Sequence, residues 1–435
     1  MRDIRIVVHD FVGHAFPIEL SREFAARGHD VLHLYFADFE APKGPLHPSR
    51  HDPVNLRVQS ATIDRPYEKY APVRRAWDDL RYVGICSRVM RDFKPDVVLS
   101  GCGAPFAQNQ LRRACQQSGI SFVAWVQDLY GPGVRAVLHR KLGSLGALVG
   151  SAFTRMDESL VRNSDGVVFI SEEFQRVFAP LRPRARGPWH VIENWAPIHD
   201  LPCRPKINDW SRSRGLAEKR VLLYSGTLGL KHNPELLARL AQSFRKYEDV
   251  AVVVISQGLG RDYLERSKAK LGLTNLPLLD YQPFEAFPEV MASGDVLLAL
   301  IEREASSYSA PSKVLSYLCA SRPLLLSIPA SNPSSRIVIS NNAGLVVEPD
   351  DAEGFINAAH HLLIDREHAS RLASNARAYA VSAFDIGKIT DRFEAALLDS
   401  LRPGHPAPAP AEQPSAAGSE EPAAAMAAAA GPRPK

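Results

Sequence analysis

The chain has 435 residues, of which 45% are hydrophobic and 23% charged, and its formal net charge is +4. These fractions are ordinary for globular protein, the length allows two or three domains, and the small net charge without a dense Lys/Arg stripe argues against a nucleic-acid partner. No run approaches the roughly 18–20 consecutive apolar residues that a membrane helix needs. The apolar run at the N-terminus is too short for a signal peptide and is better explained as a first strand.

The cysteines point to a reducing compartment. They are odd in number, scattered and never spaced as CxxC, which argues against a disulfide framework or a structural zinc site. We therefore expect a cytoplasmic protein. The five positions are Cys86, Cys102, Cys115, Cys203 and Cys319.

Strand-like runs alternate with amphipathic helices through the first half of the chain. Helices are predicted at 18–27 and 108–117. Strands separated by helices at such intervals are typical of βαβ units and a parallel sheet. The predicted strands are 4–8, 31–35, 96–100, 121–126 and 166–170.

The second half repeats this alternation, so the fold class is α/β with two Rossmann-like parallel-sheet domains facing across a cleft. The predicted strands are 221–224, 251–255, 276–279, 296–301, 323–327 and 344–347. The predicted helices are 234–247, 262–271, 284–293, 313–320 and 351–363.

Prolines cluster where the two halves join, at Pro197, Pro202 and Pro205. A ligand between two such sheets is expected at the carboxyl ends of their strands. The chain from residue 402 is rich in Pro and Ala and lacks the apolar content to fold, so it is expected to be disordered. The expected units are a first Rossmann-like domain (1–198), a second Rossmann-like domain (199–383), a C-terminal helix that packs back on the first domain (384–401) and a tail (402–435).

Two strand–turn–helix junctions in the second half are suited to phosphate. The strand at 221–224 runs into a turn that contains Gly226, Thr227 and Lys231, and a second junction carries Ser312 and Lys313. Helix N-termini offer free amides and a positive dipole end, and a lysine beside each adds a point charge. The pair predicts a bound nucleoside diphosphate. The alternatives are that Lys231 is a solvated lysine and that Ser312 only caps a helix.

Candidates in the first half follow predicted strands. Asp128 comes after the strand at 121–126, where it would either face the ligand or cap the following turn. Gly13 and His14 lie in the loop after the first strand, where Gly13 would allow a close approach to the diphosphate and His14 could hydrogen-bond sugar or phosphate. His9 and His29 are expected to be structural.

A run of apolar residues recurs at helical spacing, with Arg135, Arg140 and Lys141 alongside. It could face a membrane that carries anionic lipid. An ordinary core-packing helix is the favoured interpretation. The apolar residues are Leu138, Leu142, Leu145, Val149, Phe153 and Met156.

Seven fragments in this order resemble the family-four glycosyltransferases, which are retaining, metal-independent enzymes of the GT-B fold. The closest likeness is to the bacterial exopolysaccharide and lipopolysaccharide branch of colanic-acid type. The fragments are 24–31, 94–98, 164–172, 191–195, 223–229, 294–298 and 311–313.

The resemblance implies sugar transfer from a nucleotide-sugar donor to a glycan or lipid-linked acceptor, with no metal or other cofactor, at the cytoplasmic membrane face. It implies that the domain at 1–198 binds the acceptor and that the domain at 199–383 binds the nucleotide sugar. It implies catalytic roles for Asp128 and Lys231, Asp128 orienting groups rather than attacking. The implied donor-binding residues are Gly13, His14, Gly226, Thr227, Lys231, Ser312, Lys313 and Ser316.

The chain also departs from the family pattern. Tyr308 and Ser316 stand where many members carry a pair of glutamates, and Thr227 replaces an arginine. Glu302 and Glu304 lie upstream and would serve only if the loop bends differently. Two alternatives therefore remain: a sugar-nucleotide 2-epimerase of the same fold, and a non-catalytic nucleotide- or glycan-binding protein.

Overall fold

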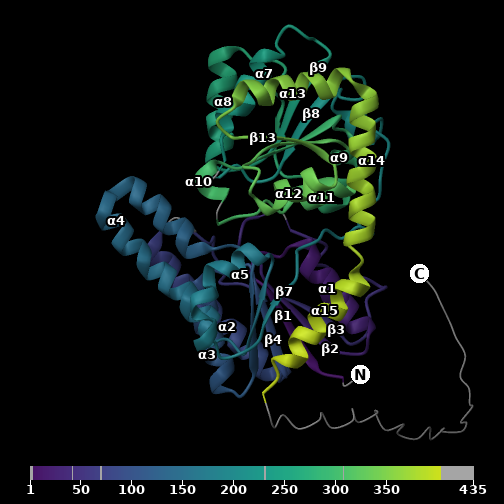
Figure 1. Cartoon of the computed structure of the whole chain (residues 1–435). Helices are drawn as coiled ribbons and strands as arrows, with labels where there is room; N and C mark the ends of the chain where they lie inside the picture. Colours follow the sequence, from purple (N-terminus) through teal and green to yellow (C-terminus); the bar gives the residue numbers. More distant parts are fainter. Residues whose placement is uncertain (1–2, 42, 69–70, 230–231, 307, 403–435) are drawn as a thin grey trace, which may run out of the picture.

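The computed structural model describes residues 3–402 except 42, 69–70, 230–231 and 307. The two halves of the chain form two parallel sheets with flanking helices (Figure 1). None of the described helices has the length and apolar character needed to cross a bilayer. All of the predicted tail beyond Arg402 lies outside the described residues.

The first sheet has seven strands in the order β3-β2-β1-β4-β5-β6-β7, all of them parallel. Its central strands are buried on both faces, as continuous aliphatic runs in a parallel sheet require. The strands are β1 (Arg5–Asp10), β2 (Asp30–Phe36), β3 (Leu56–Ala61), β4 (Val97–Gly101), β5 (Ser121–Val126), β6 (Gly166–Phe169) and β7 (Trp189–Val191).

Alternate side chains of β1 reach opposite layers of helices. Ile6 and Val8 belong to the core with Phe24 of α1, whereas Val7 belongs to the core with Met90 of α2. The helices around this sheet are α1 (Ala15–Ala26), α2 (Pro72–Phe93), α3 (Pro105–Gln117), α4 (Tyr130–Asn163), α5 (Glu172–Phe178) and the 3-10 turn η1 (Ala179–Arg184).

The second sheet has six parallel strands in the order β10-β9-β8-β11-β12-β13. The strands are β8 (Arg220–Ser225), β9 (Val250–Ile255), β10 (Leu278–Leu279), β11 (Val296–Leu300), β12 (Leu324–Ser327) and β13 (Gly344–Val347). Its helices are α6 (Asp209–Ser213), α7 (Pro234–Ser243), α8 (Leu259–Leu271), η2 (Phe284–Ala286), α9 (Phe287–Ala292), α10 (Arg303–Ser306), α11 (Lys313–Cys319), α12 (Pro333–Ser340), α13 (Ala352–Ile364) and α14 (Arg366–Ala383), and they are followed by α15 (Ile386–Asp399).

The strands predicted from the sequence are all present, within one or two residues at each end. The helix predicted at 284–293 is divided into η2 and α9, and Pro288 lies in the first turn of α9. Several elements were not predicted, among them the strand β3 and the long helices α2 and α14. The α2 sequence mixes charged with apolar residues, and its buried face includes Tyr82, Cys86 and Met90.

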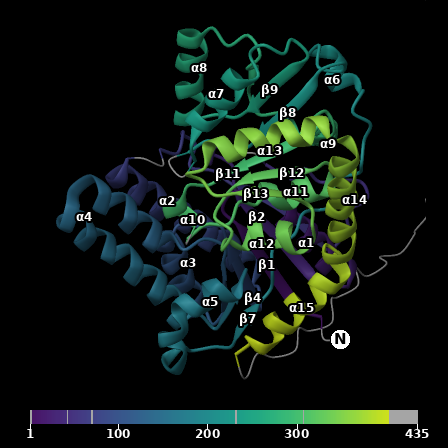
Figure 2. The same cartoon turned by 45° about the horizontal axis from the view of Figure 1, so that its top comes forward.

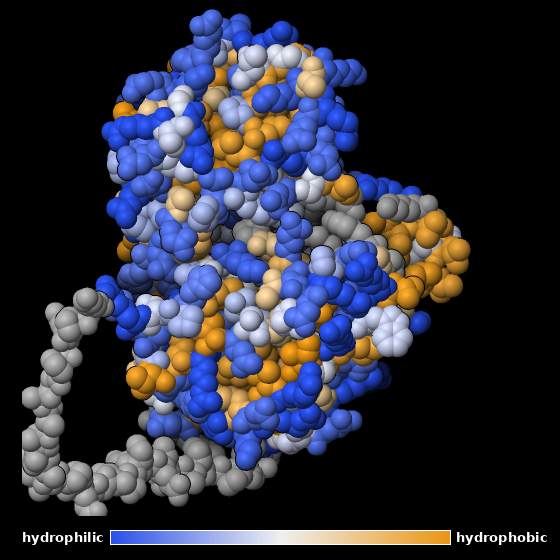
Figure 3. All heavy atoms as spheres, turned by 180° about the vertical axis from the view of Figure 1, so that it is seen from behind, coloured by the Kyte–Doolittle hydropathy of each residue, from blue (hydrophilic) through white to orange (hydrophobic). Residues whose placement is uncertain are grey.

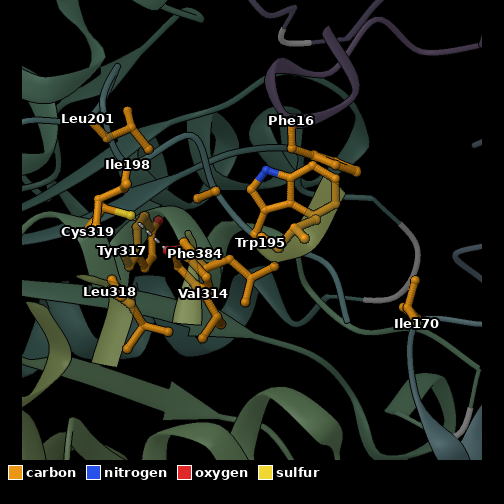
Figure 4. Packing of buried hydrophobic residues seen from close by; sticks show 14 of the residues in the cluster. Phe16, Ile170, Trp195, Ile198, Leu201, Val314, Tyr317, Leu318, Cys319 and Phe384 are labelled. Carbon is orange, nitrogen blue, oxygen red and sulfur yellow. Dashed lines mark hydrogen bonds between the residues drawn. The ribbon is translucent and has the colours of Figure 1, made fainter. Parts of the chain in front are cut away.

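One continuous core joins the two halves through the linker. Trp195 lies 5.9 Å from Trp125 between ring centroids, and Phe393 of α15 lies 4.9 Å from Trp125 and 5.8 Å from Trp195. Figure 4 shows Ile198 and Leu201 of the linker beside α11. The linker is therefore packed rather than loose.

The last helix returns to the first sheet. After α14 runs alongside the second sheet, α15 lies along α1 (Figures 1 and 2). Arg27 of α1 pairs with Glu394 at 3.0 Å and with Asp391 at 2.7 Å, and His29 meets Glu394 at 3.2 Å. The second domain is thus tied to the first at two points in the chain, the linker before it and α15 after it.

We expect Phe393→Ala to lower stability by about 3–5 kcal/mol, because the buried ring fills space between two tryptophans and its loss leaves a cavity. Leu398→Ala on the same helix is the control, since Leu398 is 37% exposed and its truncation should cost less than the loss of a fully buried ring. Thermal unfolding of both variants measures the difference. Equal midpoints would mean that α15 does not contribute to this core.

Candidate functional site between the two sheets

The carboxyl edges of the two sheets face each other. The Leu129 amide, just after β5, donates to the Tyr308 carbonyl oxygen at 3.0 Å. Arg336 of α12 pairs with Glu173 of α5 at 2.7 Å. Each contact joins a segment that follows a strand of one sheet to a segment that follows a strand of the other, so residues at both edges border one region (Figure 2).

Two of the predicted donor-site residues meet at the end of β8. Gly226 has φ +133°, and a Cβ there would lie 2.9 Å from Lys313 Cε and 3.0 Å from Lys313 Nζ. Any larger residue would therefore be strained and would displace the lysine. The Lys313 ammonium lies 3.6 Å from the centre of the Tyr224 ring, a cation–π contact. The structure thus places a cation against a half-buried glycine turn.

Tyr317 holds this turn in place, and sequence patterns did not single it out. Its hydroxyl donates to the Ser225 carbonyl at 3.0 Å and accepts from the Ser225 amide at 2.8 Å. The Tyr224 hydroxyl donates to the Thr227 carbonyl at 2.9 Å. Burial raises the pKa of both phenols, so they remain neutral hydrogen-bonding groups.

Other predicted donor residues lie around the same turn. Thr227 is exposed, and its hydroxyl lies 2.7 Å from the Tyr281 hydroxyl. Ser316 is half-buried on α11. The alternative that Ser312 only caps α11 is wrong, because Ser312 has helical φ/ψ and its side chain makes no capping hydrogen bond. Lys231 lies outside the described residues.

Tyr308 lies at the interface between the two domains. A Cβ on Gly133 would lie 2.9 Å from the Tyr308 ring, so the ring packs directly on the start of α4. Burial, with the neighbouring Glu304, raises the pKa of Glu302, while Arg140 of α4 opposes the shift. Glu302 therefore lies near Arg140 of the first domain.

Asp128 is exposed at the end of β5, and α4 begins without a side-chain cap. Close by, Asp157 accepts a hydrogen bond from the Gly131 amide. Burial raises the pKa of Asp157 to about 7, and the charges of Glu158 and Asp128 add to that shift. Asp157 was not predicted, because nothing in the sequence signals that a mid-helix carboxylate folds back on the loop after β5.

The loop after β1 is organised by Asp10, which was also not predicted. The buried carboxylate accepts hydrogen bonds from the Val12 and His14 amides, and Gly13 between them has φ +87°. Burial favours a higher pKa for Asp10, but hydrogen bonds and charge interactions with His14, with a charge term from His33, lower it to about 2. His14 is left partly exposed, with Nδ1 3.4 Å from Cys102 Sγ.

The predicted structural histidines are buried or bonded within the fold. His9 contacts Ser100 at 2.9 Å and Tyr82 at 2.7 Å, and burial lowers its pKa to about 4. His29 Nδ1 accepts from the Ile4 amide at 3.3 Å. Neither histidine faces the second sheet through these contacts.

Two groups of side chains among the described residues have the spacing to hold a metal ion. One is Asp10, His14 and Cys102, and the other is His361, Asp365 and His368. Neither group includes a residue of the turn at Gly226 or of α11.

Family models match both halves of the chain. The "Glycosyl transferase 4-like domain" matches residues 18–195, and "Glycosyl transferases group 1" matches residues 206–379. WcaI of Escherichia coli (strain K12), named as a colanic acid biosynthesis glycosyl transferase, is 24% identical over 311 residues, which are 70% of this chain and 74% of WcaI.

Solved structures share the fold at low identity. Anabaena Alr3699/HepE in complex with UDP and glucose superposes with a TM-score of 0.66 at 16% identity, covering 91% of this chain and 99% of HepE. WaaG, a glycosyltransferase involved in lipopolysaccharide biosynthesis, gives 0.61 at 15% identity, covering 91% and 99%. Since the two models match the two sheet domains in the expected order, the chain belongs to the family-four type of glycosyltransferases and has the GT-B fold.

Proposed function

We propose that the enzyme transfers a sugar from a nucleotide-sugar donor to a glycan acceptor, with retention, in cell-surface polysaccharide synthesis. The observation that carries the proposal is the contact between Gly226 and Lys313, which sets a cation against a backbone turn with no side chain in the way. The bound UDP and glucose of HepE, and the polysaccharide and lipopolysaccharide roles named for WcaI and WaaG, support the donor class and the pathway.

The proposed chemistry follows from charge. The diphosphate leaving group gains negative charge as its bond to the sugar breaks, so a preorganised cation stabilises the transition state more than the ground state. Lys313 supplies that cation, and Lys231 is proposed as a second. We propose that the facing carboxyl edges of the two sheets exclude water from the reacting sugar, which limits hydrolysis.

Retention requires the acceptor to attack from the face that the diphosphate leaves. We propose that the leaving phosphate takes the acceptor proton and that Asp128 orients acceptor or sugar hydroxyls. This assignment suits an exposed carboxylate beside the interdomain contact of Leu129. The proposed site residues in the first domain are Gly13, His14 and Asp128. Those in the second are Gly226, Thr227, Lys231, Ser312, Lys313 and Ser316.

We expect one member of a UDP, GDP, ADP and TDP panel to raise the unfolding midpoint, because a ligand that binds only the folded chain stabilises it. The shift and the transfer of sugar should persist in EDTA, because lysines rather than a metal neutralise the diphosphate. The anomeric configuration of the product, read by NMR, tests retention. A strict Mn²⁺ or Mg²⁺ requirement would contradict the metal-free proposal, and conversion of the donor without acceptor would indicate an epimerase.

The acceptor is proposed to be lipid-linked. We propose that the enzyme reaches it at the cytoplasmic face of the membrane, with α4 contacting the lipid surface. This helix folds into a hairpin at Gly143 (φ 57°, ψ −138°), and the arms touch at glycines. A Cβ on Gly146 would lie 2.0 Å from the Leu138 carbonyl oxygen, and one on Gly150 would lie 2.5 Å from Arg135 Cα. The close-packed hairpin protrudes from the first domain (Figures 1 and 2).

The hairpin tip is apolar, so the expectation of ordinary core packing is wrong for much of this helix. Leu142, Leu145 and Leu148 are 57%, 64% and 67% exposed, and Val149 is 47% exposed. From behind, the tip stands out as a hydrophobic patch (Figure 3). Exposed Arg135 and Arg140 lie on the same hairpin. Apolar tip residues flanked by arginines are suited to an anionic lipid surface.

We expect Leu145→Ser combined with Leu148→Ser to weaken binding to phosphatidylglycerol vesicles by about tenfold or more, since burying one leucine is worth roughly 1.5–3 kcal/mol. Val381→Ser is the control, because Val381 is 58% exposed on α14, away from the hairpin. Vesicle sedimentation gives both affinities. Equal binding by the parent and the double variant would remove α4 as the membrane contact.

A further inference from the structure

Three potential metal ligands converge at the carboxyl edge of the first sheet. Asp10 ends β1, Cys102 follows β4, and His14 lies in the loop after β1, and these two strands are neighbours in the sheet. One ligand atom from each residue lies within 4.8 Å of the others. A carboxylate, an imidazole and a thiol together form a set suited to Zn²⁺.

The separations approach those of a tetrahedral site. His14 Nδ1 lies 3.4 Å from Cys102 Sγ and 3.8 Å from Asp10 Oδ1. Zinc–ligand bonds of about 2.0–2.3 Å at tetrahedral angles place ligand atoms about 3.3–3.7 Å apart. Cys102 Sγ also donates to Gln127 Oε1 at 3.0 Å, so an amide oxygen adjoins the same position. Only small side-chain movements separate this arrangement from coordination.

The arrangement is fixed before any ion arrives. Asp10 is 1% exposed and is held by backbone amides, so its carboxylate has little freedom to move. Cys102 adopts φ +57°, a left-handed conformation that costs a non-glycine residue roughly 1–2 kcal/mol. Such strain persists only where the surroundings impose it. The partly exposed His14 leaves a route for an ion from solvent.

The geometry points to a Zn²⁺ site formed by Asp10, His14 and Cys102, at which a bound ion would withdraw His14 from the donor and inhibit transfer. The inhibition rests on the proposed function, whereas the binding does not. Binding replaces the thiol proton by the metal, and that proton passes to solvent with no change of oxidation state. The ionised Asp10 and the resulting thiolate then balance the charge of the ion.

The second candidate set must be separated from this site. His361, Asp365 and His368 lie at the exposed junction of α13 and α14. His361 Nε2 already hydrogen-bonds His368 Nδ1 at 2.9 Å, closer than two ligands of one tetrahedral zinc. These surface histidines could nevertheless bind Zn²⁺, so the test removes them first.

The full chain carrying His361→Asn and His368→Asn is the reference for the test. We expect it to bind one Zn²⁺ in competition with a chromogenic chelator, without donor or acceptor present. Adding Cys102→Ser should weaken that binding by roughly 10- to 100-fold or more, since even residues that only orient a ligand contribute that much. A serine can still donate to Gln127, and an unchanged unfolding midpoint without metal shows that folding is retained.

Alkylation followed by peptide mass spectrometry gives an independent readout on the same reference chain. Zn²⁺ should protect Cys102 and leave the exposed Cys203 equally reactive. No stoichiometric binding by the reference chain, or equal affinity after Cys102→Ser, would overturn the proposal. Binding with no effect on transfer would leave the site in place and remove only the inhibitory role. Neither readout needs turnover, so a failure of the proposed transferase activity would be recognised separately.

Discussion

The packing around Trp195 determines which parts of the two sheets meet. The linker tryptophan stacks on Trp125 of the first sheet, and Phe393 closes the same cluster after the chain has passed through the whole second domain. Because the chain is anchored to the first sheet on both sides of the second, the two carboxyl edges are held toward each other. Residues after β1 and β5 therefore lie at the same interface as those after β8 and β11.

Within that frame, the donor side is built from aromatic residues as much as from glycine and lysine. Tyr317 fixes Ser225 by two hydrogen bonds, and the Tyr224 ring lies under the Lys313 ammonium. A lysine held in this way has given up much of its rotamer freedom before a ligand arrives. Preorganisation of this kind is what electrostatic stabilisation of a leaving group needs.

The strand pattern and the glycine turn at Gly226 could be predicted from the sequence, because aliphatic runs and turn residues act over a few positions. The sequence showed Gly226 and Lys313 at two similar strand–turn–helix junctions, but not that the two residues lie against each other. Other contacts depend on packing between distant segments. Tyr317 reaches Ser225 across 92 positions, and Cys102 reaches His14 across 88.

The α4 hairpin shows a different limit of sequence patterns. Its apolar spacing fits a core helix equally well, and only the reversal at Gly143 exposes Leu142 and Leu145 to solvent. The cation site is likewise invisible as a motif, since its three ligands come from two neighbouring strands rather than from one spaced run. A metal-free transfer and an inhibitory cation are compatible, because the proposed ion acts on His14 in the first domain and not on the diphosphate.

The central claim is that the turn at Gly226, set against Lys313, binds the donor diphosphate. Calorimetric titration of the nucleoside diphosphate that the UDP, GDP, ADP and TDP panel selects, into Gly226→Ala and Gly215→Ala, tests it most directly. Gly215 has φ +63° and open space at its Cβ, so its variant also places a side chain at positive φ, but before β8, at the opposite edge of the sheet. The account predicts a loss of at least about 1.4 kcal/mol, or tenfold, in affinity for that nucleotide for Gly226→Ala alone. Equal affinities for the two variants and the parent chain would contradict it.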